Sequence, residues 1–135
     1  MRRSQSGSAG VVEIVLLAPL FMLVAMFIVE IGRVESARTN VAYAAHAAAR
    51  AAAQRASGDA AADATAVAGD TMAGEGVACT NLQVVTETAD LLPAGTAKVT
   101  VSCTTSFADL GPLHLGAMTV SSSAVETVDN VRGGP

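Results

Sequence analysis

The longest feature of the chain is an apolar run over residues 11–31, which reads VVEIVLLAPLFMLVAMFIVEI. As a helix that rises about 1.5 Å per residue, this run would extend about 31 Å, close to the hydrocarbon thickness of a bilayer. Its ionisable residues, Glu13 and Glu30, lie near its ends, where carboxylates can reach the lipid headgroups. Membrane helices tolerate a proline such as Pro19 with a modest kink. The pattern predicts a transmembrane helix over residues 11–31.

The charges around this run predict its orientation. Arg2 and Arg3 precede it without any acidic residue, so the positive-inside tendency places the N-terminus in the cytoplasm and the chain after Arg33 outside. Residues 1–10 are then a cytoplasmic leader-like segment. A cleaved secretory signal peptide is the alternative, with Ser36-Ala37 as a weak cleavage site. The run is longer than the usual apolar region of about 7 to 15 residues, which favours a retained span.

Residues 32–76 form an alanine-rich segment, which we expect to be a helical stalk outside the cytoplasm. Nine of the twelve residues at positions 42–53 are alanine, the strongest helix former. Small apolar residues recur at spacings of three and four, and polar residues mark another face. This small-residue stripe suits packing on the chain's own C-terminal part or against another molecule, and both remain open. Asp59 is expected to cap a second, shorter helix that ends near Ala73.

The composition changes to Thr, Val and Ser after Val77. Residues 82–88, 97–103 and 118–125 look like strands, and Pro and Gly residues mark both connections. In the second of these segments, alternate residues share one face, namely Ala97, Val99, Val101 and Cys103. The pattern predicts a small antiparallel β domain over residues 77–129 and a disordered tail over residues 130–135. The expected fold class is therefore α+β.

Length and charge exclude several classes of function. The chain has 135 residues and no Trp, so it holds at most one compact domain of roughly 100 to 200 residues and is no large catalytic scaffold. Its formal net charge of −4 argues against a nucleic-acid partner. From Ser57 onward, nine acidic and two basic residues would keep an exported domain soluble.

The two cysteines are the strongest candidates for chemistry. Cys79 precedes the first expected strand and Cys103 ends the second, where the ends of an antiparallel hairpin meet. A location outside the cytoplasm permits a disulfide, and its loop of about 25 residues would stabilise the fold by about 3 kcal/mol. Free thiols are one alternative. The other is a zinc site with His46 and His114, which no short paired ligand spacing supports.

Neither histidine lies beside a Ser or Cys motif of the kind that nucleophilic catalysis uses. His46 falls in the alanine-rich helix and His114 in a connection between strands. We therefore expect no catalytic residue, no cofactor and no bound metal, and solvated side chains at both positions.

Several short motifs occur together in about the first 55 residues. They are Gly-Ser-Ala at 7–9, Val12-Glu13, Pro19 six residues after Glu13, Glu30-Ile-Gly-Arg33 at the end of the span, and an alanine and arginine-rich helix at 44–53. As a set, they resemble the TadE family of minor-pilin-like proteins of the tight-adherence (Flp pilus) assembly system, especially the versions found in high-GC Gram-positive bacteria.

The resemblance implies a non-catalytic, single-pass membrane protein that serves as a minor pilin or assembly component of a tight-adherence pilus or a related secretion machine. Its partners would be other pilin-like subunits, inner-membrane platform proteins, a prepilin peptidase and the lipid bilayer. The resemblance leaves open whether the chain stays in the cell membrane or enters an extracellular pilus. The alternative is a secreted or tethered extracytoplasmic binding module, released after signal cleavage.

The resemblance also implies roles for three residues. Pilin precursors are cut after a Gly that precedes the span, and Glu is the fifth residue of the mature chain. A cut after Gly7 makes Glu13 the sixth mature residue, whereas a cut after Ser8 makes it the fifth. Glu13 would then pair with the N-terminal ammonium of a neighbouring subunit and set its axial register. The competing interpretation of Glu13 is a carboxylate that only reaches the lipid headgroups.

Overall fold

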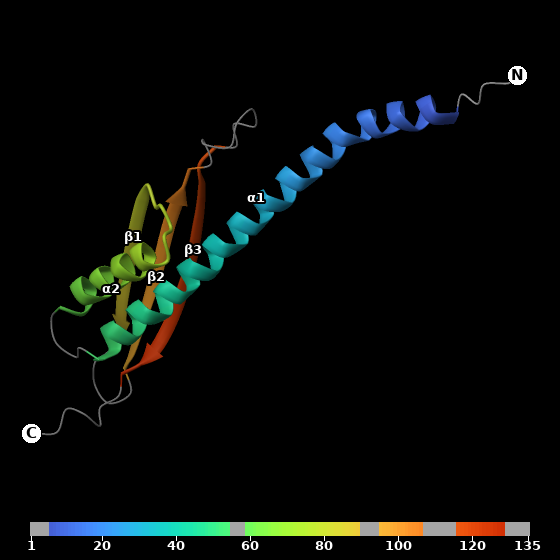
Figure 1. The fold of residues 1–135 in the computed structure, drawn as a ribbon. Coiled ribbons are helices and arrows are strands. Elements are labelled where there is room, and N and C mark those ends of the chain that lie inside the picture. Colours follow the sequence, from blue (N-terminus) through green and yellow to red (C-terminus); the bar gives the residue numbers. More distant parts are fainter. Residues whose placement is uncertain (1–5, 55–58, 90–94, 107–115, 129–135) are drawn as a thin grey trace, which may run out of the picture. The chain divides into compact units, whose positions relative to one another are not determined.

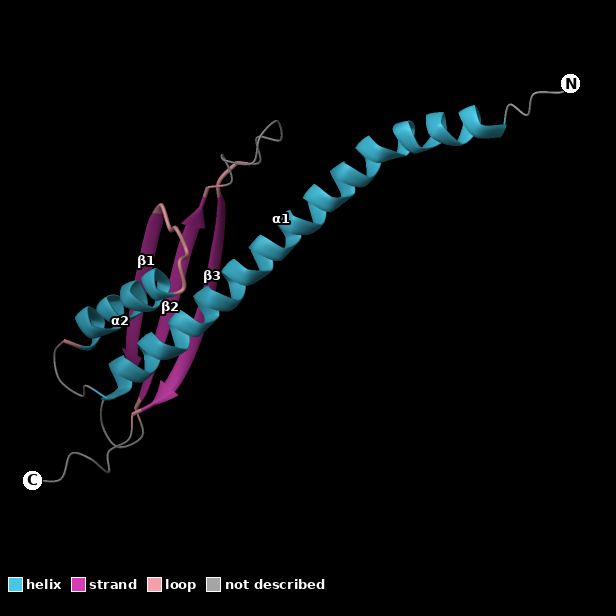
Figure 2. Cartoon of the chain, in the orientation of Figure 1, coloured by secondary structure: helices cyan, strands magenta, loops and turns pink. Residues whose placement is uncertain are grey.

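The computed structural model describes residues 6–54, 59–89, 95–106 and 116–128 (Figure 1). The elements follow in the order helix, helix, strand, strand, strand (Figure 2). Their bounds are α1 Ser6–Gln54, α2 Ala60–Gly74, β1 Asn81–Ala89, β2 Thr96–Thr105 and β3 Met118–Thr127. The α+β fold predicted from the sequence is confirmed. The chain divides into two compact units, Met1–Glu35 and Ser36–Pro135.

Helix α1 is 49 residues long and continues through Pro19. It already begins at Ser6, so residues 6–10 of the expected leader-like segment are helical. The first unit contains the apolar part of α1, whereas the alanine-rich part belongs to the second unit.

Helix α2 begins after Asp59, which occupies the N-cap position as expected. The Asp59 side chain makes no capping hydrogen bond. Its backbone carbonyl accepts the first helical bond, of 3.0 Å, from the Asp63 N–H. The C-terminal end closes through Gly76, whose φ of 67° lies in the left-handed region that glycine adopts at little cost. There the Val77 N–H donates to the Met72 carbonyl at 3.2 Å, which satisfies a terminal acceptor of the helix.

The three strands form one antiparallel sheet in the order β1-β2-β3. Each strand covers its predicted segment and extends past it at one end or both. The central register pairs Val84 with Val101 and Val101 with Ser122. Most of both connections between the strands and the expected tail lie outside the described residues.

One face of the sheet is covered by the two helices, and this layer holds the core of the second unit. The predicted face of β2 is confirmed, because Ala97, Val99, Val101 and Cys103 are all fully buried. They belong to one cluster with buried side chains of both helices, all of them Ala except two: Val41, Ala44, Ala45, Ala48, Ala49, Ala52, Ala64, Ala68 and Met72. The alanine stripe of α1 thus packs within its own chain, the first of the two alternatives. Small side chains let the helices approach the sheet closely.

The opposite face of the sheet is open and rich in hydroxyl groups. Its exposed hydroxyl residues on β3 are Thr119, Ser121, Ser123 and Thr127, and Val125 is exposed among them. Thr104 and Thr119 share a hydrogen bond of 2.9 Å between their Oγ1 atoms. Glu87 and Lys98 form an ion pair of 3.3 Å on this face. The sheet therefore has the apolar-in, polar-out alternation of a sheet solvated on one side.

Candidate functional site

The first unit presents a helix whose large apolar side chains are exposed. Leu16 is 71% exposed, Ile14 69%, Phe21 68% and Phe27 66%. The mean hydropathy over its most apolar 18 residues is 2.7, and none of that window is buried within the chain. Exposed apolar patches of this size mark interaction or membrane surfaces in proteins. The helix is long and apolar enough to cross a bilayer, so it fits a membrane anchor.

Both acidic residues of the span lie on α1. Glu13 is exposed on the helix surface, and Glu30 is half-buried. The backbone of Gly7 and Ser8, the expected processing positions, belongs to the first turn of α1. The structure therefore places Gly7, Ser8 and Glu13 on the same end of one helix. Their roles in processing and assembly remain predictions.

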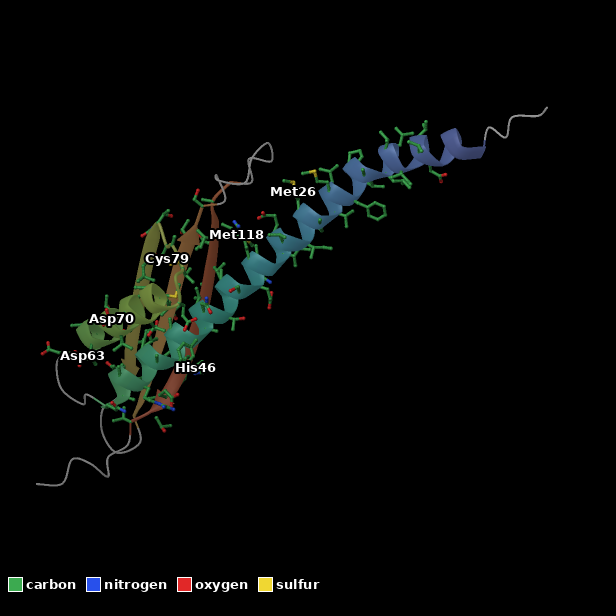
Figure 3. All side chains as sticks on the ribbon, viewed as in Figure 1. Met26, His46, Asp63, Asp70, Cys79 and Met118 are labelled. Carbon is green, nitrogen blue, oxygen red and sulfur yellow. A yellow bond between two sulfur atoms is a disulfide. The ribbon has the colours of Figure 1, made fainter. Side chains whose placement is uncertain are left out.

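The two cysteines are joined in a disulfide, with their Cα atoms 5.4 Å apart (Figure 3). Cys103 lies on the buried face of β2, and Cys79 belongs to the connection between α2 and β1. Next to Cys79, the backbone N–H of Thr80 donates to the Thr104 carbonyl at 2.8 Å and its hydroxyl donates to the same oxygen at 2.9 Å. Together with the disulfide, these two hydrogen bonds attach the connection between α2 and β1 to strand β2.

Groups that support metal or acid–base chemistry are not clustered in the part of the chain that the structure describes. No three His, Cys, Asp or Glu side chains come together among those residues. His46 is exposed on α1, and His114 lies outside the described residues. Since the disulfide uses both cysteines, the zinc site weighed from the sequence loses two of its four ligands.

A groove between the two helices was not found from the sequence. Its volume is about 470 Å³, and it is lined by Ala51 and Gln54 of α1 and by Asp63, Ala66 and Val67 of α2. The relevant signal is the pair of small residues, Ala51 and Ala66, that leaves space between the helices. Helical periodicity assigned the residues of α1 to faces but gave no information on which part of α2 would lie beside them.

Comparison with known families finds a match to the N-terminal part of the chain. The model of the family described as TadE-like protein matches residues 9–50. That segment contains the whole apolar span, Glu13 and Glu30, and most of the alanine-rich part of α1. No curated protein and no solved structure matches the chain. The resemblance expected from the sequence is confirmed, and residues 9–50 identify the N-terminal part of this chain as TadE-like.

Proposed function

We propose that this protein is a membrane-anchored structural component of a tight-adherence pilus or a related secretion machine, a minor pilin or an assembly protein without catalytic activity. The observation that carries the proposal is the TadE-like segment at 9–50, which coincides with the exposed apolar helix. Its partners would be other pilin-like subunits and the platform proteins of the same membrane. The second unit would lie outside the cytoplasm, where its disulfide is stable.

The proposed processing sites have a physical consequence in this structure. The bonds after Gly7 and after Ser8 both lie in the first turn of α1. A helix end frays readily, so a peptidase at the cytoplasmic face can bind this turn in an extended form. Cutting there removes Arg2 and Arg3, which anchor the span inside, and creates an ammonium group close to Glu13.

Glu13 is the proposed assembly residue. An exposed carboxylate at the edge of the hydrocarbon gains the most from an opposite charge, because the low dielectric strengthens the attraction. The ammonium of a processed neighbouring subunit supplies that charge. Glu13→Gln keeps the shape of the side chain and removes its charge. It should leave processing intact and reduce incorporation into pili.

N-terminal sequencing of the protein, isolated from cells with an active pilus system, tests this proposal. The expected mature N-terminus is Ser8 or Ala9, and Gly7→Leu should abolish a cut that leaves Ser8 first. A chain that still starts at Met1 or Arg2 would contradict processing and the pairing role of Glu13.

Deletion of the gene, followed by counting pili by electron microscopy, tests the proposed role in the pilus or secretion machine. Unchanged pilus number and unchanged secretion would contradict that role.

A further inference from the structure

The groove between α1 and α2 lies beside an exposed stripe of larger side chains on α1. Tyr43 is 61% exposed, and His46, Arg50 and Gln54 follow it on the same side at helical spacing. Tyr43 is the single tyrosine of the chain. Exposed tyrosine and arginine side chains on one surface are residue types that contribute much of the binding energy at protein interfaces. We call residues 43, 46 and 50 the α1 stripe.

The outer side of α2 has the opposite character. Its exposed positions are small or acidic, and they include Ala62, Ala66, Asp70 and Ala73. Small side chains leave space for a large one to enter between the helices. The groove offers that space, lined by Ala51, Ala66 and Val67 together with Asp63.

Charge is divided between the two helices in the same way. Residues 36–54 of α1 contain Arg38 and Arg50 and no acidic residue. Residues 59–75 contain four acidic residues, Asp59, Asp63, Asp70 and Glu75, and no Lys or Arg. The α1 stripe and the outer side of α2 are therefore complementary in both size and charge, which steers association and selects a partner.

We propose that a second copy of this chain docks on the groove, with its Tyr43 ring over Ala51, Ala66 and Val67 and its Arg50 beside the acidic residues of α2. Because each copy has both a stripe and a groove on its helical layer, a two-fold arrangement makes the same contact twice and closes the assembly at a dimer. This self-association does not depend on the pilus role, since it uses residues of the second unit alone.

Photocrosslinking of the full-length protein in reconstituted membranes tests the contact. A benzophenone side chain replaces Tyr43, and equal amounts of unlabelled and ¹⁵N-labelled protein are mixed before illumination. The expected product joins the peptide that contains residue 43 to a peptide from residues 60–74. If the two forms pair at random, about half of the crosslinked dimers contain one labelled and one unlabelled chain. A probe at Ser123, on the open face of the sheet, is the control and should not reach residues 60–74. Products without mixed-isotope pairs, or without residues 60–74, would overturn the proposal.

A charge exchange separates the contact from general misfolding. Arg50→Glu should lower the yield of crosslinked dimer at least about fivefold, and the second change Asp63→Lys or Asp70→Lys should restore it. Lys98→Glu is the matched control, because it reverses a cation on the sheet face away from the helices and should leave the yield unchanged. An intact disulfide and unchanged circular dichroism verify the fold of each variant. Equal losses with Lys98→Glu, or restoration by neither acid exchange, would refute this mode of pairing.

Discussion

The two parts of α1 carry opposite distributions of side-chain size and exposure on one helix. Over residues 11–31 the large side chains are exposed, with Phe21 at 68% and Leu16 at 71%. Over residues 36–54 the apolar side chains are mostly alanine, and one face is fully buried. Among the described residues, the first part exposes large apolar side chains, whereas the second buries small ones against the sheet of its own unit.

This difference shows what each environment selects. Lipid solvates large apolar groups on all sides of a helix, so the span needs neither small residues nor an amphipathic pattern. A helix that packs onto a sheet is stabilised by close approach and needs one apolar face. Alanines at spacings of three and four form such a face and are small enough for close approach. Side-chain size, more than hydrophobicity alone, therefore distinguishes the exposed apolar part of α1 from the packed part.

The largest effect is expected from charges placed in the span. Phe21→Arg combined with Val24→Arg should cost about 5 to 7 kcal/mol of insertion free energy, at about 2.5 to 3.5 kcal/mol per arginine. The protein should leave the membrane fraction on carbonate extraction. Tyr43→Arg with His46→Arg has the same spacing on the same helix and should stay in that fraction. If the span variant also stays, residues 11–31 are not the anchor.

The next effect concerns the covalent tie of the second unit. Removing the disulfide with Cys79→Ala and Cys103→Ala should lower the free energy of unfolding by about 3 kcal/mol, because the open chain regains conformational entropy. Urea unfolding of the detergent-solubilised protein, followed by circular dichroism of the sheet, measures this loss. Wild-type protein treated with a reductant should show a similar shift. Coincident unfolding curves for all three samples would show that the tie adds no stability.

Overpacking the alanine face should have an effect of intermediate size. Ala48 is fully buried, so Ala48→Leu forces helix and sheet apart and should cost about 1 to 3 kcal/mol in the same urea experiment. His46→Leu adds leucine two positions away, on the exposed side, and should be neutral or slightly stabilising. Equal stability of the two variants would mean that the alanine face is not packed.

The smallest effect is expected at the surface of the sheet. The Lys98 Nζ and Glu87 Oε2 atoms are 3.3 Å apart, but the two side chains are 48% and 65% exposed. A double-mutant cycle with Glu87→Gln and Lys98→Met should give a coupling energy below about 1 kcal/mol, reduced further by salt. A coupling energy larger than the cost of Ala48→Leu would show that charge contributes more than packing to the stability of the second unit.

The sequence predicted those elements whose periodicity is unambiguous. The apolar run, the alanine stripe and the alternation of Ala97, Val99, Val101 and Cys103 all depend on local spacing, and the structure bears them out. The disulfide followed from the positions of Cys79 and Cys103 at the ends of a hairpin.

Other features depend on contacts between elements and could not be predicted from local patterns. The alanine stripe fitted either an intramolecular or an intermolecular partner until the sheet was seen to cover it. The groove beside Ala51 and Ala66 depends on where α2 lies, which no periodicity specifies. An aspartate before a helix predicts a side-chain cap. Asp59 does occupy the N-cap position, but with a φ of −109° and a ψ of 14° its side chain makes no capping hydrogen bond.

Helix α1 is proposed to anchor the chain in the membrane, with the second unit outside the cytoplasm. Cysteines introduced one at a time, by Arg3→Cys and Ser123→Cys, are labelled with a membrane-impermeant maleimide in intact protoplasts of cells without the prepilin peptidase, so that residues 1–8 stay attached to the chain. The native cysteines stay unreactive in their disulfide. We expect labelling of position 123 in intact protoplasts and of position 3 only after permeabilisation. Labelling of position 3 but not of position 123 in intact protoplasts, or of neither before permeabilisation, would contradict this topology.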